Sequence, residues 1–108
     1  MDNFKVIYRI LKHLEASMDY EEFDADAISP SKLGITRERW EQLLVMMQED
    51  GYIKGIKMIN TTTSLRCHVI PPVMPTITIK GLEYLANNTL MKKAANFAKG
   101  IKDVTPGL

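Results

Sequence analysis

The chain has 108 residues, of which 45% are hydrophobic and 25% are charged, and these ordinary globular values exclude a largely disordered chain. The formal net charge is +1 and the pI is about 7.8, below the value of about 9 that a domain built only for nucleic acid usually exceeds. The single cysteine, Cys67, excludes an intrachain disulfide, and no apolar run approaches the roughly 18 residues of a membrane span. We therefore expect one cytoplasmic domain over residues 1–108, without a signal peptide or membrane segment, in which residues 102–108 form a flexible tail.

The first segment has the pattern of an amphipathic helix from about Asn3 to Met18. Its apolar residues recur at spacings of three and four, which places them on one face of the helix. These residues are Phe4, Ile7, Leu11, Leu14 and Met18. The following residues, up to Ala27, are dense in Asp and Glu and show no regular period, so they predict a solvated acidic loop.

A short helix is predicted directly after the acidic loop. Ser29 followed by Pro30 is typical of a helix N-terminus, where serine caps and proline occupies the first turn. Gly34 fits the left-handed residue that ends a helix. Residues 30–33 therefore predict one helical turn.

A longer helix is predicted from Arg37 to Asp50, with Thr36 as its cap and Gly51 as its stop. Its apolar stripe consists of Trp40, Leu43, Leu44 and Met47. With that stripe buried, the exposed residues are expected to be Arg37, Glu38, Glu41, Gln42, Val45, Gln48 and Glu49. The two helices and the turn between them predict a helix-turn-helix.

Two alternating segments then predict the strands of a β-hairpin. The first runs from Tyr52 to Ile59 and the second from Leu65 to Ile70, and the polar residues 60–64 between them have the length of a hairpin loop. This loop would be the wing of a winged helix, and it contains no Lys or Arg. Three prolines at positions 71, 72 and 75 end the hairpin, because proline cannot donate to a sheet, so an irregular link is expected there.

Two helical segments are predicted after the link. Thr78 is the expected cap of a two-turn helix over residues 80–87, and a further helix with a broad apolar face follows Thr89 and extends to about Ile101. The order helix, short helix, helix, hairpin, helix predicts an α+β winged-helix fold with a hairpin of two or three strands. Its expected core consists of Phe4, Ile7, Leu11, Leu33, Trp40, Leu44 and Ile53.

Several sequence blocks are more specific than the fold pattern. They are residues 3–11, residues 33–35 with Trp40, residues 51–53 and residues 77–85. Together, in this order, they resemble the YjcQ family of bacteria and their phages over about residues 3–101. The resemblance implies a winged-helix fold, in agreement with the patterns above, and it implies no particular activity or functional residue.

The residue spacings typical of enzymes and metal sites are absent from the sequence. It has no Gly-rich phosphate loop, no Gly-x-Ser-x-Gly, no His-Glu-x-x-His and no Cys-x-x-Cys. Cys67 and His68 are neighbours in an alternating strand, so they point to opposite faces and cannot bind one metal ion together. We therefore expect no enzymatic activity, metal or cofactor, and Cys67 is expected to be a small core residue.

Double-stranded DNA is the first candidate partner, because the second helix of a helix-turn-helix commonly lies in the major groove. The cations placed to contact phosphates are Lys32, Arg37, Arg39, Lys57 and Arg66, with Lys54 nearby. Three of the seven residues expected to be exposed on the longer helix are acidic, and Arg37 can pair with Glu41 four residues later. The cations are therefore either phosphate contacts or an ordinary solvated surface.

A protein partner is the alternative, since a fold does not fix a function. Residues 90–101 include seven apolar residues among twelve, more than a helix resting on one small core needs. We expect a homodimer whose contact residues are Leu90, Met91, Ala94, Phe97, Ala98 and Ile101. The other interpretation is that this helix packs on the first helix of its own chain.

Overall fold

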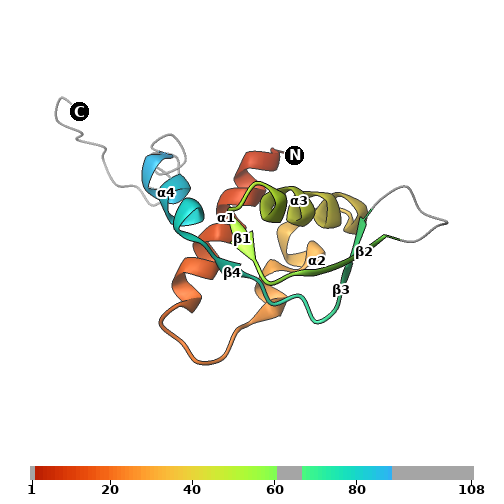
Figure 1. The fold of residues 1–108 in the computed structure, drawn as a ribbon, viewed down its shortest axis with the longest axis horizontal. Helices are drawn as coiled ribbons and strands as arrows, with labels where there is room; N and C mark the ends of the chain where they lie inside the picture. Colours follow the sequence, from red (N-terminus) through yellow and green to blue (C-terminus); the bar gives the residue numbers. More distant parts are fainter. Residues whose placement is uncertain (1, 61–66, 89–108) are drawn as a thin grey trace.

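The computed structural model describes residues 2–60 and 67–88, so the wing loop with Arg66, the segment 90–101 and the expected tail 102–108 lie outside the described residues. The described part is α+β, with four α-helices and a small antiparallel hairpin, and is compatible with the predicted winged helix (Figure 1). The elements in chain order are α1 (Asn3–Ser17), the 3-10 helix η1 (Ala25–Ile28), α2 (Pro30–Leu33), α3 (Arg37–Glu49), β1 (Ile53–Lys54), β2 (Lys57–Asn60), β3 (Cys67–Ile70), β4 (Thr76–Ile77) and α4 (Ile79–Asn87).

The helix boundaries follow from the predicted caps. The hydroxyl of Ser29 accepts the backbone N–H of Lys32 at the start of α2, and the hydroxyl of Thr36 accepts that of Arg39 at the start of α3. Gly34 ends α2 in the left-handed conformation, with φ of 72°. These caps confirm the predicted helix-turn-helix because they satisfy N–H groups that a helix leaves without an intrahelical partner.

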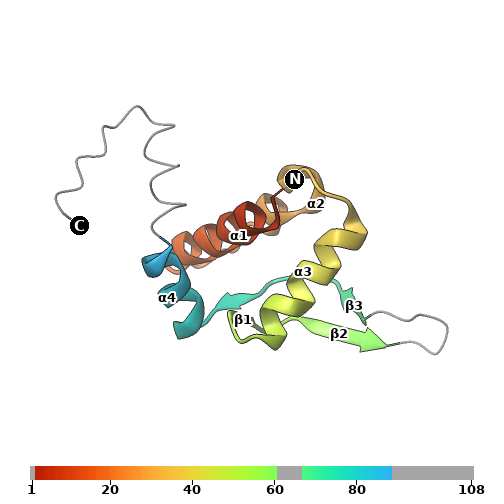
Figure 2. The same ribbon diagram turned by 90° about the horizontal axis from the view of Figure 1, so that it is seen from above.

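The predicted buried face of α1 is partly wrong. The buried residues are Val6, Ile10, Leu11 and Leu14, whereas Phe4 is 60% exposed and Met18 is 61% exposed. Helix α1 contacts α4, β4, η1 and α3, so its neighbours cover a face that is rotated from the predicted stripe (Figure 2). Two sets of apolar residues in α1 have helical periodicity, one that begins at Phe4 and one that begins at Val6. Only these tertiary contacts decide which set is buried.

The predicted core is otherwise confirmed around α3. Leu11, Leu33, Trp40, Leu44 and Ile53 are all buried, while Ile7 is half-buried. The indole N–H of Trp40 donates a hydrogen bond of 2.7 Å to the backbone carbonyl of Ile28 in η1. Trp40 therefore joins α3 to the end of the acidic loop through both packing and a hydrogen bond.

The strands differ in one respect from the prediction. Strands β2 and β3 form the expected antiparallel hairpin, with Lys57 opposite Ile70 and Asn60 opposite Cys67. The first predicted strand, however, breaks at Gly55, where φ is 93°, and its beginning pairs as β1 with β4. The segment after the prolines thus supplies a short strand where the sequence predicts an irregular link.

Candidate nucleic-acid interface

Two polar side chains attach the hairpin region to α3. Glu41 is only 9% exposed; its carboxylate accepts the backbone N–H of Val69 at 3.2 Å and lies 3.2 Å from Nδ1 of His68. The Gln48 amide donates to the backbone carbonyl of Ile56 at 2.9 Å and accepts its N–H at 2.8 Å. The prediction that Glu41 is exposed is therefore wrong, and Gln48 is half-buried, because strand residues cover this edge of α3.

The inward orientation of Glu41 changes the charge that α3 presents. Its first two turns expose Arg37, Glu38, Arg39 and Gln42, and Glu49 is exposed at the other end of the helix. Only one carboxylate therefore remains exposed in the first two turns of α3. The cations of α3 are concentrated at its N-terminal end, next to the turn of the helix-turn-helix.

Both arginines of α3 have partners within the chain. The guanidinium of Arg37 lies 5.2 Å from the centre of the Trp40 ring and 4.0 Å from the carboxylate of Glu41, which confirms the predicted pairing four residues apart. The guanidinium of Arg39 donates to the side-chain oxygen of Asn3 at 2.8 Å. These contacts orient the two guanidinium groups while both residues stay exposed.

Two further cations lie near α2. The ammonium of Lys32 is 4.0 Å from the carboxylate of Asp26, and both side chains are largely exposed, so solvent screens this pair. The guanidinium of Arg9 in α1 donates to the backbone carbonyl of Lys32 at 3.1 Å. Arg9 is a candidate that the sequence analysis missed, since no local pattern indicates that α1 approaches the end of α2.

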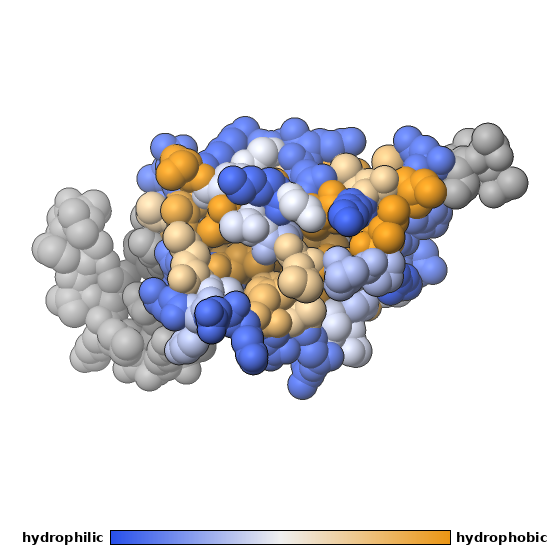
Figure 3. Space-filling view, turned by 60° about the horizontal axis from the view of Figure 1, so that its bottom comes forward, coloured by the Kyte–Doolittle hydropathy of each residue, from blue (hydrophilic) through white to orange (hydrophobic). Residues whose placement is uncertain are grey.

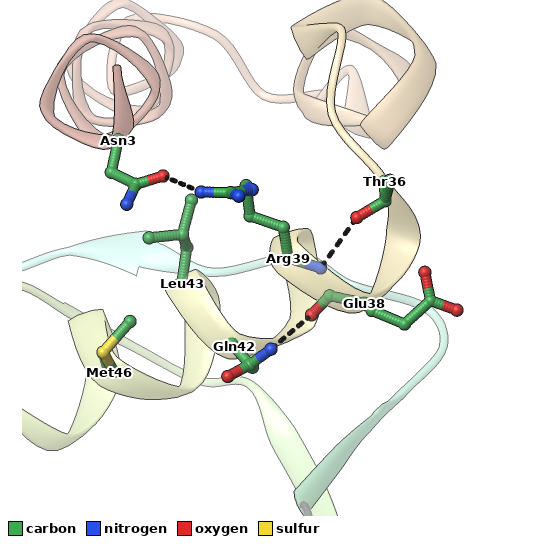
Figure 4. A pocket seen from close by; sticks show the side chains of 7 residues that line it. All are labelled: Asn3, Thr36, Glu38, Arg39, Gln42, Leu43 and Met46. Carbon is green, nitrogen blue, oxygen red and sulfur yellow. Dashed lines mark hydrogen bonds between the residues drawn. The ribbon is translucent and has the colours of Figure 1, made fainter. Parts of the chain in front are cut away.

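A pocket of about 360 Å³ lies between α3 and the start of α1 (Figure 4). The guanidinium of Arg39 points toward Asn3, and the Glu38 carboxylate points away from that guanidinium (Figure 4). Gln42 also lines the pocket, and its amide donates to the backbone carbonyl of Glu38 at 3.4 Å. The remaining lining residues are Thr36, Leu43 and Met46. The pocket thus offers guanidinium and amide N–H groups, which are donors for an anionic oxygen.

The predicted wing cations are not joined to this site by any described contact. Lys57 is exposed on β2 next to Met58, which pairs with the buried Val69, so Lys57 lies on the hairpin face that points away from α3. Apolar surface is present at this end of the molecule, where Ile59 and Ile70 are exposed (Figure 3). Arg66 lies outside the described residues. The structure therefore brings together Lys32, Arg37 and Arg39 around the turn, without Lys57.

Cys67 is half-buried rather than a core residue and lines a shallow hollow beside α3 with Gln42, Val45, Met46 and Glu49. Among residues 2–60 and 67–88, no group of three or more His, Cys, Asp or Glu side chains is arranged to hold a metal ion. In the same part of the chain, no helix has the length and apolar character needed to cross a membrane.

Comparisons with known proteins identify the family. No curated protein and no solved structure matches the chain. A family model described as YjcQ protein matches residues 8–104, which is nearly the whole chain. The match includes α2, α3, the strands and α4, and it agrees with the resemblance of the sequence blocks. The chain therefore belongs to the YjcQ family.

Proposed function

We propose that the protein is a regulator that binds double-stranded DNA through the N-terminal turns of α3 and the cations beside them. The observation that carries this proposal is the inward orientation of Glu41, which leaves Glu38 as the only exposed carboxylate in the first two turns of α3, beside the exposed Arg37 and Arg39. The N-terminal residues of a recognition helix are the ones that contact base edges in helix-turn-helix proteins. The proposal therefore places the contact where the positive charge of α3 is concentrated.

The exposed side chains divide into two kinds of contact. Arg9, Lys32, Arg37 and Arg39 are suited to phosphate oxygens, which fix register without reading sequence. Gln42 and Glu38 have the chemistry to read base edges, since glutamine pairs with adenine and glutamate accepts from cytosine. DNA in the proposed complex would displace Asn3 and Asp26 from Arg39 and Lys32, or share these cations with them.

Such a site binds weakly and depends strongly on salt. Each phosphate contact steepens the fall of log K with log salt by about 0.9, so four contacts give a slope of about −3.6. Between about 50 and 200 mM salt the affinity should therefore fall about 150-fold. A pI of about 7.8 is consistent with a protein that has only a few such contacts.

The test is to measure binding to random duplex DNA across this salt range. The double variant Arg37→Ala with Arg39→Ala should lower affinity at the lowest salt and reduce the slope by about 1.8. The matched control is Lys12→Ala with Lys80→Ala, which removes the same charge from positions that pair with Glu15 and with the Asp50 carbonyl. No binding at the lowest salt, or equal losses in the two double variants, would refute the DNA proposal.

A protein-binding adaptor is the second candidate function. The observation that favours it is exposed apolar surface on α1 and α3, where Phe4 is 60% exposed and Met46 is 49% exposed. Methionine side chains adapt to varied partner surfaces. A protein that does not bind DNA even at low salt would leave the adaptor as the better proposal.

The proposal also specifies where the protein works and what it lacks. A regulator of bacterial or phage DNA acts in the cytoplasm, and a chain with Cys67 as its one cysteine needs no oxidising compartment. We further propose that it has no enzymatic activity and uses no cofactor.

A further inference from the structure

A second surface lies between the first turn of α1, the end of α3 and α4. It is an apolar groove of about 290 Å³, which we call the α1–α4 groove; its lining includes Phe4, Ile7, Met46, Tyr52, Tyr84 and Asp50. The rings of Tyr52 and Tyr84 meet edge to face with their centres 5.5 Å apart. Figure 1 shows the start of α1, the end of α3 and α4 near one another. The groove adjoins the pocket of the proposed DNA site, because Asn3, Leu43 and Met46 line both, but none of the cations of that site lines the groove.

The groove is chemically matched to a segment of the same sequence. Residues 89–101 contain three lysines and no acidic residue, and their large apolar side chains include Phe97. The groove has apolar walls and Asp50 in its lining, and the negative charge of Asp2 adds a small part to the raised pKa of Tyr84, at the edge of the groove. An apolar centre with oppositely charged groups at its edge is the usual composition of a specific protein interface.

We propose that residues 89–101 of a second copy of the chain occupy the α1–α4 groove, with Phe97 placed against Phe4. Reciprocal exchange of this segment gives a closed two-fold dimer, because each copy supplies one groove and one segment. Seven apolar residues among the twelve from Leu90 to Ile101 would then be covered without requiring a larger core in one chain.

The position where α4 ends favours the segment of a second copy, rather than the chain's own segment, as the occupant of the groove. The hydroxyl of Tyr84 shares a hydrogen bond with the side chain of Asn88, so the chain leaves α4 at the edge of its own groove. Only Asn88 and Thr89 lie between α4 and Leu90, so few residues are available to turn the chain's own segment back onto the groove. The chain's own segment would have to reverse direction at once, whereas a second copy can place the middle of the segment over the groove.

Sedimentation of the full-length chain tests this dimer. The wild type should sediment at twice 12.3 kDa at high micromolar concentration, and Phe4→Ser and Phe97→Asp should each return it to 12.3 kDa. Ile79→Ser is the matched control, since Ile79 is 74% exposed and does not line the groove, and this variant should stay dimeric. A monomeric wild type, or a dimer that Phe4→Ser leaves intact, overturns the proposal. Circular dichroism of each variant verifies that loss of the dimer is not loss of the fold.

Isotope-filtered NMR distinguishes a groove that is occupied by the segment of a second copy from one that is occupied by the chain's own segment. In an equal mixture of labelled and unlabelled protein, nuclear Overhauser effects should join the Met46 methyl of one copy to the Phe97 ring of the other. The methyl of Met74, exposed but not part of the groove, is the internal control and should show none. Effects that appear only within one chain would show that the segment folds back on its own groove, and would refute the exchange. The DNA-binding experiment measures neither the oligomeric state nor the contacts between copies, so the two proposals can fail independently.

Discussion

The carboxylate of Glu41 in α3 accepts the backbone N–H of Val69 in β3 at 3.2 Å, and Val69 is itself buried. Replacing Glu41 by alanine would leave this N–H without its acceptor, which costs about 1 to 3 kcal/mol of folding free energy. We therefore predict that Glu41→Ala lowers the free energy of unfolding by about that amount in urea denaturation. Glu41→Gln should cost less, because its amide oxygen still accepts.

Glu38→Ala is the matched control for this prediction, because it removes the same carboxylate from an exposed position on the same helix. Exposed substitutions of this kind usually change stability by less than about 0.5 kcal/mol. Equal effects at the two positions would show that the contact between Glu41 and Val69 does not hold the hairpin to α3.

A second prediction concerns Trp40, which is buried and donates to the carbonyl of Ile28. Trp40→Ala should destabilise the fold by about 3 to 5 kcal/mol, as large-to-small core substitutions do. Trp40→Phe retains much of the packing but loses the hydrogen bond, so its cost should be smaller. Tyr20→Ala, at a ring 74% exposed, should change little. Urea denaturation measures these costs, and tryptophan emission typical of water would contradict the buried position of Trp40.

The elements that the sequence predicts well are those specified by local chemistry. Ser29, Gly34 and Thr36 fix the ends of α2 and α3 through contacts within a few residues, so their roles can be read from the chain alone. The stripe of α3 through Trp40 is similarly local. These features position the helix-turn-helix and the candidate site on it.

The features that the sequence does not predict depend on distant partners. Glu41 faces Val69, 28 residues later, and Arg9 reaches the carbonyl of Lys32, 23 residues later. Glutamate on an amphipathic helix normally predicts solvent exposure, and nothing near it in the sequence indicates a strand N–H as its partner. The exposed position of Phe4 is of the same kind, because the neighbours of α1 decide which of two apolar stripes is covered.

A third prediction concerns Gly81, within α4. A Cβ atom added there would meet the backbone carbonyl of Tyr52 and lie 2.7 Å from Cγ1 of Ile77. Glycine to alanine inside a helix ordinarily stabilises by about 0.5 to 1 kcal/mol. Here we predict the opposite sign, a loss of about 1 to 3 kcal/mol from overpacking.

Thermal or urea unfolding of Gly81→Ala decides this sign directly. Glu83→Ala serves as the control, since it places alanine at an exposed position of the same helix and should stay within about 0.5 kcal/mol of wild type. Stabilisation by Gly81→Ala would mean that α4 is not packed against Tyr52 and Ile77.

The last prediction concerns pH and Tyr84, at the edge of the α1–α4 groove. Partial burial raises the pKa of Tyr84 above its usual value of 10.0, and the hydrogen bond with Asn88 opposes part of this rise. A raised pKa in the folded state means that the fold favours the neutral phenol. Its contribution to stability is therefore fully present below about pH 10 and is lost as pH rises through the higher folded value.

Tyr84→Phe removes the ionisable group, so its free energy of unfolding should fall less steeply than that of wild type between about pH 9 and 11.5. Urea denaturation across this range measures the slopes, with Tyr20→Phe, at the exposed ring, as the control expected to keep the wild-type slope. If Tyr84→Phe and Tyr20→Phe gave the same slope, the environment of Tyr84 would not favour its neutral form.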